Sequence, residues 1–167
     1  IVYMPSPTHH ARHGEPHFFV IGWLGAYCAA TPGVSGSDNV TLRLDYENEV
    51  QPDALLRLDP ALGGRCTVSD DDYLEGPPEL IVEIAASSAS YDMHQKRRVY
   101  ARNGVPEYIV LLAYEQRMAW FVLREGVYEA LTPDDAGISR SEIFPGLWLQ
   151  TSALLEGDLA RVLDVLE

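Results

Sequence analysis

The fold of this chain is decided by the stretch Glu79-Leu80-Ile81-Val82-Glu83-Ile84-Ala85. The stretch is apolar except at its first residue and at Glu83, and turn-forming residues precede it. An apolar run of this length is typical of a central strand that other elements cover on both faces. We therefore predict a central β-strand over residues 79–85, with one carboxylate in an otherwise dry setting.

Helices and strands are predicted on both sides of this strand. Apolar residues at helical spacing predict helices over residues 17–30, 91–103 and 154–166. Strands are predicted over residues 40–46, 50–58, 107–112, 118–123, 127–131 and, as a short one, 144–149. Residues 59–79 are rich in Gly, Pro and Asp and are predicted to form a long loop. This order indicates an α/β (α+β) fold, in which a mixed β-sheet core is flanked by helices.

The composition is that of an acidic globular protein. The chain has 167 residues, 47% of them hydrophobic, with 25 Asp plus Glu against 12 Lys plus Arg and a formal net charge of −13. These values fit one folded domain, and the acidic balance disfavours a generic electrostatic nucleic-acid binder. Residues 1–16, rich in Pro and His, are predicted to form an irregular N-terminal arm, and residues 17–167 a single domain.

Two further features predict a cytoplasmic protein without a membrane span. Cys28 and Cys66 are too few for a disulfide framework and match no zinc-binding spacing, so both thiols are expected to be reduced. The longest apolar stretch, residues 18–30, is interrupted by glycines and is too short to span a bilayer.

Two carboxylates are candidates for chemistry. Glu83 lies in a strand that is otherwise dry, where a carboxylate is unfavourable unless it meets a cation, a metal or strong donors. A structural ion pair or an exposed strand face would also account for it. Asp53 follows Pro52 at the start of a predicted strand, where ordinary turn chemistry is the alternative interpretation.

Lys96, the only lysine of the chain, is the third candidate. On a helical wheel it falls inside the apolar arc formed by Met93, Val99 and Tyr100. A surface pair between Asp92 and Lys96 at i,i+4 is the alternative, but such a pair is more usual on the outer face of a helix. We therefore expect Lys96 to point toward the sheet.

Two carboxylates and a lysine suit metal-assisted hydrolysis of a phosphodiester. Carboxylate oxygens bind hard divalent cations such as Mg²⁺ or Mn²⁺. Such a cation polarises a phosphate and lowers the pKa of a bound water, and a lysine stabilises the charge that develops at phosphorus. Asp53, Glu83 and Lys96 are accordingly predicted to be catalytic.

Four stretches of the sequence together resemble a known family. They are Pro52-Asp53, Glu79-Leu80-Ile81-Val82-Glu83-Ile84, Asp92-Met93-His94-Gln95-Lys96 and Tyr100-Ala101-Arg102-Asn103-Gly104-Val105-Pro106-Glu107-Tyr108. Over roughly residues 17–150 the chain resembles the Uma-two family of restriction endonucleases, which belongs to the PD-(D/E)XK nuclease superfamily. The YxxxGVxEY stretch is the most specific part of this resemblance. It implies a restriction-endonuclease-like fold and a Mg²⁺-dependent endonuclease that hydrolyses DNA phosphodiester bonds.

The resemblance also implies roles for individual residues. The metal ligands would be Asp53, Glu83 and the main-chain carbonyl of Ile84. In the usual superfamily pattern the lysine lies two residues after the glutamate, where this chain has Ala85, and Lys96 matches the displaced position on the following helix. Supporting roles are implied at three further positions, for orienting Lys96, for capping the helix and for completing the site: Asp92, Ser87 and Tyr100.

The chain is expected to bind nucleic acid and to form a homodimer. The local cationic residues Arg97, Arg98 and Arg102 are predicted to bind nucleic acid, and a homodimer is expected because superfamily enzymes often dimerise. The alternative is a catalytically weak or inactive nuclease-fold module for binding or dimerisation, which the acidic charge and Leu112, where the family commonly has an acidic residue, both favour. A carboxylate-pair hydrolase acting on sugars is a third interpretation, but it leaves Lys96 without a role.

Overall fold

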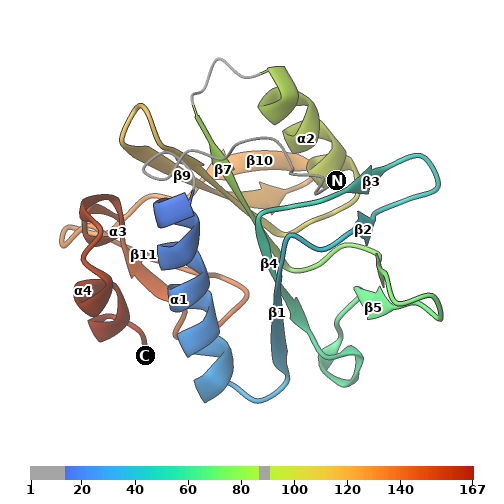
Figure 1. Cartoon of the computed structure of the whole chain (residues 1–167), viewed down its shortest axis with the longest axis horizontal. Coiled ribbons are helices and arrows are strands. Elements are labelled where there is room, and N and C mark those ends of the chain that lie inside the picture. Colours follow the sequence, from blue (N-terminus) through green and yellow to red (C-terminus); the bar gives the residue numbers. More distant parts are fainter. Residues whose placement is uncertain (1–13, 87–90) are drawn as a thin grey trace, which may run out of the picture.

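The structure, a computed structural model, describes residues 14–86 and 91–167, with the side chains of residues 91 and 92 left out (Figure 1). Most of the predicted N-terminal arm, residues 1–13, therefore lies outside the described residues. Helix α1 (Glu15–Ala30) begins inside the predicted arm, two residues before the expected start. Pro16 lies in its first turn, where a missing backbone N–H leaves no hydrogen bond unmade.

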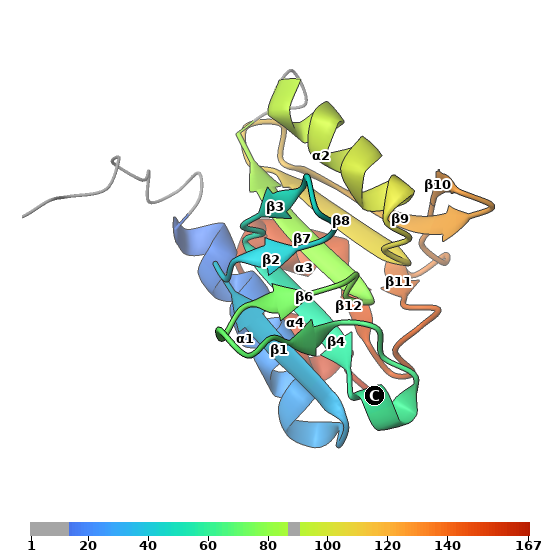
Figure 2. The ribbon, with the colours of Figure 1, turned by 90° about the vertical axis from the view of Figure 1, so that its right-hand side faces the viewer.

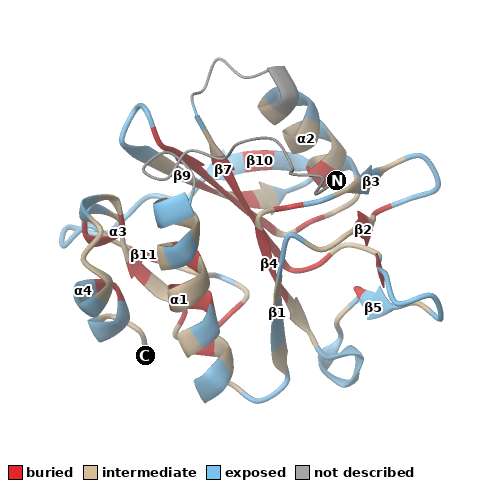
Figure 3. Cartoon of the chain, viewed as in Figure 1, coloured by how far each residue is buried: buried red, intermediate tan, exposed pale blue. Residues whose placement is uncertain are grey.

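The predicted central strand is confirmed and lies inside a six-stranded mixed sheet. In spatial order the strands are β1 (Val34–Asp38), β4 (Ala54–Leu58), β7 (Leu80–Ala85), β8 (Glu107–Leu112), β9 (Arg117–Arg124) and β10 (Val127–Ala130). β7 and β8 pair in parallel, and every other neighbouring pair in this sheet is antiparallel. Buried residues concentrate on the middle strands (Figure 3), which is why β7 could be recognised from its apolar run.

Helices cover both faces of this sheet. On one face α1 packs with α3 (Thr151–Glu156) and α4 (Leu159–Asp164), and on the other face lies α2 (Tyr91–Arg102), as Figure 1 shows. Alternate residues of β7 supply the two cores, Val82 facing α1 and Ile81 facing α2. The predicted α/β (α+β) class, with a mixed sheet flanked by helices, is thereby confirmed.

A small second sheet extends the α2 side of the molecule (Figure 2). Its strands, in spatial order, are β3 (Glu49–Val50), β2 (Leu42–Arg43), β6 (Leu74–Glu75) and β5 (Thr67–Val68), and a short 3₁₀ turn, η2 (Pro60–Leu62), precedes β5. A separate two-stranded ladder joins β11 (Ile138–Arg140) to β12 (Trp148–Gln150). Leu42 and Leu74 bury the inner side of the small sheet in the core under α2.

Several predicted boundaries are wrong, and hydrogen bonding accounts for them. The strand predicted over residues 50–58 is split into β3 and β4, which belong to different sheets; Pro52, between them, cannot donate to a ladder. The strand predicted over residues 40–46 shortens to β2, and the loop predicted over residues 59–79 contains β5 and β6. These strands are only two residues long, too short to show a period of two.

The C-terminal part also differs from prediction. The helix expected over residues 154–166 is broken into α3 and α4 at Gly157, which adopts a positive φ of 74° and closes α3, while Asp158 caps α4 through the N–H of Arg161. The short strand expected over residues 144–149 is β12, which lies later in the chain. β1 and β11 were not predicted, because both are short and partly polar.

Both cysteine thiols are free, as expected, and Cys66 is fully buried. Within residues 14–86 and 91–167, none of the helices combines the length and the apolar character that crossing a membrane requires.

Candidate active site

The sheet register places Asp53 opposite Glu83. β4 and β7 are antiparallel, with Ala54 paired to Val82, so the next step of the same register sets Asp53 against Glu83. Side chains of directly opposed residues lie on the same face with Cβ atoms about 5 Å apart. That face is the one covered by α2, because Leu55 and Ile81, two residues away on each strand, belong to the core under α2. Two carboxylates are thus brought together from distant parts of the sequence.

The Asp53 side chain is fixed by the backbone of β7. The N–H of Ile84 donates to Asp53 Oδ2 at 2.7 Å. In a strand the N–H and the C=O of one residue point to the same edge, so the Ile84 carbonyl also faces the Asp53 side. The Asp53 carboxylate and the Ile84 carbonyl, two of the groups proposed as metal ligands from the sequence, therefore lie at the same edge of β7 near the end of the β4–β7 ladder.

His17 holds the Asp53 main chain from the other side. Its Nε2 lies 2.9 Å from the Asp53 carbonyl oxygen, and because a carbonyl can only accept, Nε2 is the donor. The N–H of Asn39 donates to the same oxygen at 3.3 Å. The sequence did not indicate His17 as a site residue: a single His at the start of a helix carries no pattern that points to Asp53.

Glu83 is buried and is contacted by two side chains of α2. It is 6% exposed. Lys96 Nζ lies 3.3 Å from Glu83 Oε1, and the Tyr100 hydroxyl donates to the same oxygen at 2.5 Å. The prediction that Lys96 points inward is confirmed, since its side chain is only 28% exposed. Ala85, two residues after Glu83, faces the same core as Met93 of α2, so the lysine reaches this face from the helix and not from the strand.

Burial dominates the electrostatics of the site. It raises the pKa of the Glu83 carboxyl from 4.5 to about 7. Lys96 and the Tyr100 hydrogen bond lower this pKa in part, while the charge of Asp53 raises it further. Burial also raises the pKa of the Tyr100 hydroxyl, with the charge of Glu83 adding to the rise, so Tyr100 stays a donor. A like-charged carboxylate held beside a buried one is an arrangement that a cation would relieve.

Two other buried glutamates show what a purely structural carboxylate looks like in this protein. Glu79 accepts the N–H of Leu58 at 2.7 Å. Glu107 accepts the N–H groups of Glu142 and Ile143, together with the Ser141 hydroxyl and the Trp120 indole N–H. Both satisfy backbone donors: Glu79 binds the end of β4, and Glu107 fixes the segment between β11 and β12 to the sheet. Glu83 is different, because the contacts described for it come from a cation and a hydroxyl and it lies opposite another carboxylate.

The donor set fits a hard divalent cation. Within the described residues, no three His, Cys, Asp or Glu side chains gather in a way that could hold a metal ion, so a closed four-ligand zinc site does not fit here. Two carboxylates and a carbonyl do fit Mg²⁺, which is bound by one or two carboxylates and keeps waters or phosphate oxygens as its other ligands. The closest contact of Lys96 and the hydrogen bond of Tyr100 both fall on one carboxylate oxygen of Glu83, Oε1.

The remaining predicted site residues are less closely placed. Ser87 and the side chain of Asp92 lie outside the described residues, so their supporting roles stay predictions. Arg97 and Arg98 lie on the β9–β10 side of α2, where they line a shallow pocket. Arg102 instead lies 3.7 Å from Asp45 of the segment after β2. The three arginines proposed for nucleic-acid binding therefore do not form one cluster.

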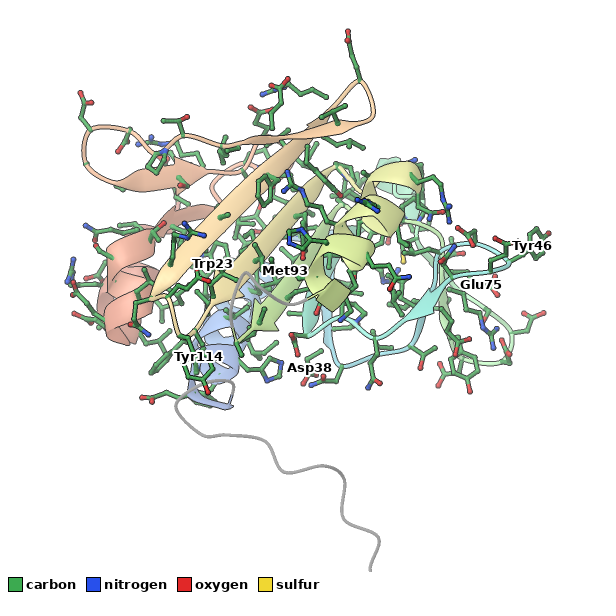
Figure 4. All side chains as sticks on the ribbon, turned by 90° about the horizontal axis from the view of Figure 1, so that it is seen from above. Trp23, Asp38, Tyr46, Glu75, Met93 and Tyr114 are labelled. Carbon is green, nitrogen blue, oxygen red and sulfur yellow. The ribbon has the colours of Figure 1, made fainter. Side chains whose placement is uncertain are left out.

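The candidate site lies at the end of the sheet where β7 leads toward α2. Figure 4 views the molecule from above and labels Met93 of α2, Tyr114 after β8 and Asp38 at the end of β1. Tyr46 and Glu75, on the small sheet, lie to one side. A larger hollow of about 620 Å³ lies beside them and includes Asp45 and Glu47 in its lining; it has none of the three predicted catalytic residues.

Comparison with known proteins gives a family and a shared fold for this chain. Residues 1–152 match the family model of Uma2, described as "Putative restriction endonuclease". Among solved structures, the chain is similar to the crystal structure of "a putative nuclease belonging to DUF820" from Anabaena variabilis ATCC 29413, with a TM-score of 0.69 and 10% sequence identity. The match covers 93% of this chain and 86% of that chain, and at this identity it shows a shared fold. The comparison with curated proteins gave no match.

Proposed function

Because this chain belongs to the Uma2 family, we propose that it is a Mg²⁺- or Mn²⁺-dependent endonuclease that hydrolyses DNA phosphodiester bonds with Asp53, Glu83 and Lys96. One observation carries the proposal: two carboxylates opposed on neighbouring strands meet the only lysine of the chain, whose Nζ lies 3.3 Å from Glu83. An acid pair with an inward lysine can support metal-assisted phosphodiester hydrolysis, since the acids hold the cation and the lysine stabilises developing negative charge.

Each residue has a distinct part in this proposal. Asp53 and Glu83, with the Ile84 carbonyl, would hold the divalent cation, which when bound supplies Lewis-acid activation of the phosphate and of a water. Ile84 N–H and His17 orient Asp53, and Tyr100 orients Glu83, so these are positioning residues. Lys96 stabilises the negative charge that develops on the phosphate as the bond breaks.

Because the chain is acidic, its binding to DNA should depend on the divalent cation. With a net charge of −13, the protein attracts nucleic acid poorly at long range. A cation bound between the carboxylates adds local positive charge where the phosphate must approach. We therefore expect weak DNA binding in EDTA, further weakened by salt, and stronger binding with divalent metal.

Plasmid cleavage and calorimetry together test the proposal. Purified protein with Mg²⁺ or Mn²⁺ should nick or cut supercoiled DNA, Lys96→Ala should abolish cleavage while still binding Mn²⁺, and Glu83→Ala should lose both. Glu107→Gln is the matched control, because it alters a buried glutamate outside the site and should keep Mn²⁺ binding. Cleavage that survives both Lys96→Ala and Glu83→Ala would overturn the assignment.

The alternative of an inactive binding module has one observation in its favour. Leu112 lies beside Ala85 in the β7–β8 register, so the strand next to the site supplies no acid at this position. If this alternative holds, calorimetry will detect no Mn²⁺ binding that depends on Asp53. A homodimer and a cytoplasmic location stay predictions; free thiols at Cys28 and Cys66 support the second of these.

A further inference from the structure

A cationic pocket lies between α2 and the β9–β10 hairpin. Its volume is about 300 Å³, and its lining includes His94, Arg97 and Arg98 of α2 and the hairpin residues 126–128. Lys96 points from the same helix toward Glu83 on β7, whereas Arg97 contacts β9, two strands farther along the sheet. The pocket is therefore separate from the carboxylates of the candidate active site.

The charge of this pocket is unusual for so acidic a chain. Its lining contains no carboxylate, whereas the larger hollow beside the small sheet is lined by several. Most arginines of the described part lie within ion-pair distance of a carboxylate: Arg43, Arg102, Arg117, Arg124, Arg140 and Arg161. Within residues 14–86 and 91–167, Arg97 and Arg98 form no such pair. With Asp plus Glu at 25 against 12 cations, two adjacent arginines without a carboxylate point to an anion from outside the chain.

Arg97 is held against an aromatic ring. Its guanidinium lies 4.1 Å from the centre of the Phe121 ring, and this ring contacts Tyr108 and Tyr128. Stacking fixes the plane of the guanidinium and leaves its N–H edge available for a planar, bidentate contact of the kind that phosphate accepts. Because the side chain is ordered before binding, less entropy is lost when a ligand binds.

We propose that this pocket binds a backbone phosphate of a nucleic-acid strand, away from the bond that is cut. The inference rests on the proposed nuclease function and extends it with a second contact to the same substrate. Lys96 and Arg97 lie on different sides of one helix, whose diameter is about 10–12 Å. A strand that crosses the helix therefore meets this pocket with a different phosphate from the scissile one. Arg102, paired with Asp45, is not part of this contact.

The test measures salt-dependent binding of a short fluorescein-labelled DNA duplex by anisotropy, in Mg²⁺ and in a Lys96→Ala background so that the probe stays intact. Arg97→Gln/Arg98→Gln should weaken binding about tenfold or more and lower the slope of log K against log salt by about 1, since one phosphate contact adds about 0.9. The matched control is Arg140→Gln/Arg161→Gln. It removes the same charge and also one arginine stacked on an aromatic ring, but both of its arginines are paired with carboxylates; its slope should stay unchanged.

A second variant leaves both arginines in place. Val127 lines the pocket and is 63% exposed, so Val127→Glu adds a carboxylate there with little risk to folding, and it should also weaken duplex binding. Val68→Glu, at an exposed site on the small sheet, is its control. Duplex binding by the arginine variant equal to that of its control overturns the inference, as does arginine-dependent binding of heparin without binding of duplex.

The two proposals fail in distinguishable ways. If the protein cleaves DNA but the arginine variant keeps the full salt slope, this inference is wrong and the nuclease function stands. If neither cleavage nor Mn²⁺ binding is found while duplex binding still depends on Arg97 and Arg98, the catalytic proposal is wrong and the phosphate contact stands.

Discussion

Replacing Glu83 by Gln should stabilise the metal-free protein at alkaline pH. Glu83 is buried, and its pKa rises from 4.5 in the free side chain to about 7 in the fold. Each pKa unit corresponds to about 1.4 kcal/mol, so the charged form lowers the free energy of unfolding by about 3 kcal/mol relative to the protonated form. The Gln side chain resembles the protonated acid and avoids this loss.

Because the fold raises the pKa of Glu83, this group makes the protein less stable as the pH increases. A raised pKa means that the contribution of Glu83 to stability is fully present below pH 4.5 and is lost as the pH rises through 7. In EDTA, wild type should therefore lose about 3 kcal/mol between pH 4.5 and 8 from this group, and Glu83→Gln should not. At pH 4.5 the two proteins should have nearly equal stability.

Divalent metal should cancel most of this difference at pH 8. A cation that binds only the folded wild type stabilises it by about 2.7 kcal/mol at a hundredfold excess over the dissociation constant, and Glu83→Gln should gain little. Urea denaturation at both pH values, in EDTA and in Mn²⁺, measures all four conditions; Glu107→Gln is the control for the metal arm and should keep the Mn²⁺ increment. An equal pH dependence for wild type and Glu83→Gln in EDTA would refute the reasoning from burial.

Five further substitutions test the site and the packing of the fold. Tyr100→Phe removes the hydrogen bond to Glu83 and should lower the free energy of unfolding by about 2 kcal/mol at pH 8 in EDTA; Tyr128→Phe, which loses a bond to the Val105 carbonyl, should lower it by about 1 kcal/mol at any pH. His17→Ala releases the Asp53 main chain and should weaken Mn²⁺ binding in calorimetry with a smaller effect on Tm, and unchanged affinity would contradict its positioning role. Gly25→Ala, on the exposed side of α1 with open space around it, should raise stability by about 1 kcal/mol in thermal denaturation, whereas Gly64→Ala should lower it by about 3 kcal/mol because its Cβ would lie 2.0 Å from the Leu58 carbonyl oxygen.

The spacing of apolar residues was sufficient to predict a helix or strand where the segment itself has a regular apolar pattern. β7 is recognisable because apolar residues cover both of its faces, and α2 because Met93, Val99 and Tyr100 share one side. The inward position of Lys96 follows from that same arc and is confirmed by its contact with Glu83. The family resemblance assigned roles to these residues, but their closeness in space depends on the pairing of β4 with β7.

What could not be predicted is set by tertiary pairing. β1 consists of Val-Ser-Gly-Ser-Asp, a segment without apolar alternation, and becomes a strand because β4 supplies hydrogen bonds along its whole length. β6 depends in the same way on β2, and β5 on β6. His17 joins the site through one main-chain carbonyl, and the separation of Arg102 from Arg97 comes from a partner, Asp45, on the small sheet. The local sequence pattern predicts none of these contacts.

The spread of the site over three elements also bears on how the protein acquires it. The hydrogen bond from Ile84 to Asp53 closes a segment of 31 residues, and the one from Tyr100 to Glu83 joins a helix to a strand across 17 residues. Closing such segments loses chain entropy that is recovered only when the distant partners have paired. Helix α2 can form early, but the proposed metal ligands Asp53 and Glu83 come together only when β4 and β7 have paired. A refolding chain should therefore regain helical structure before it regains metal affinity, which makes Mn²⁺ binding a kinetic reporter of the completed sheet.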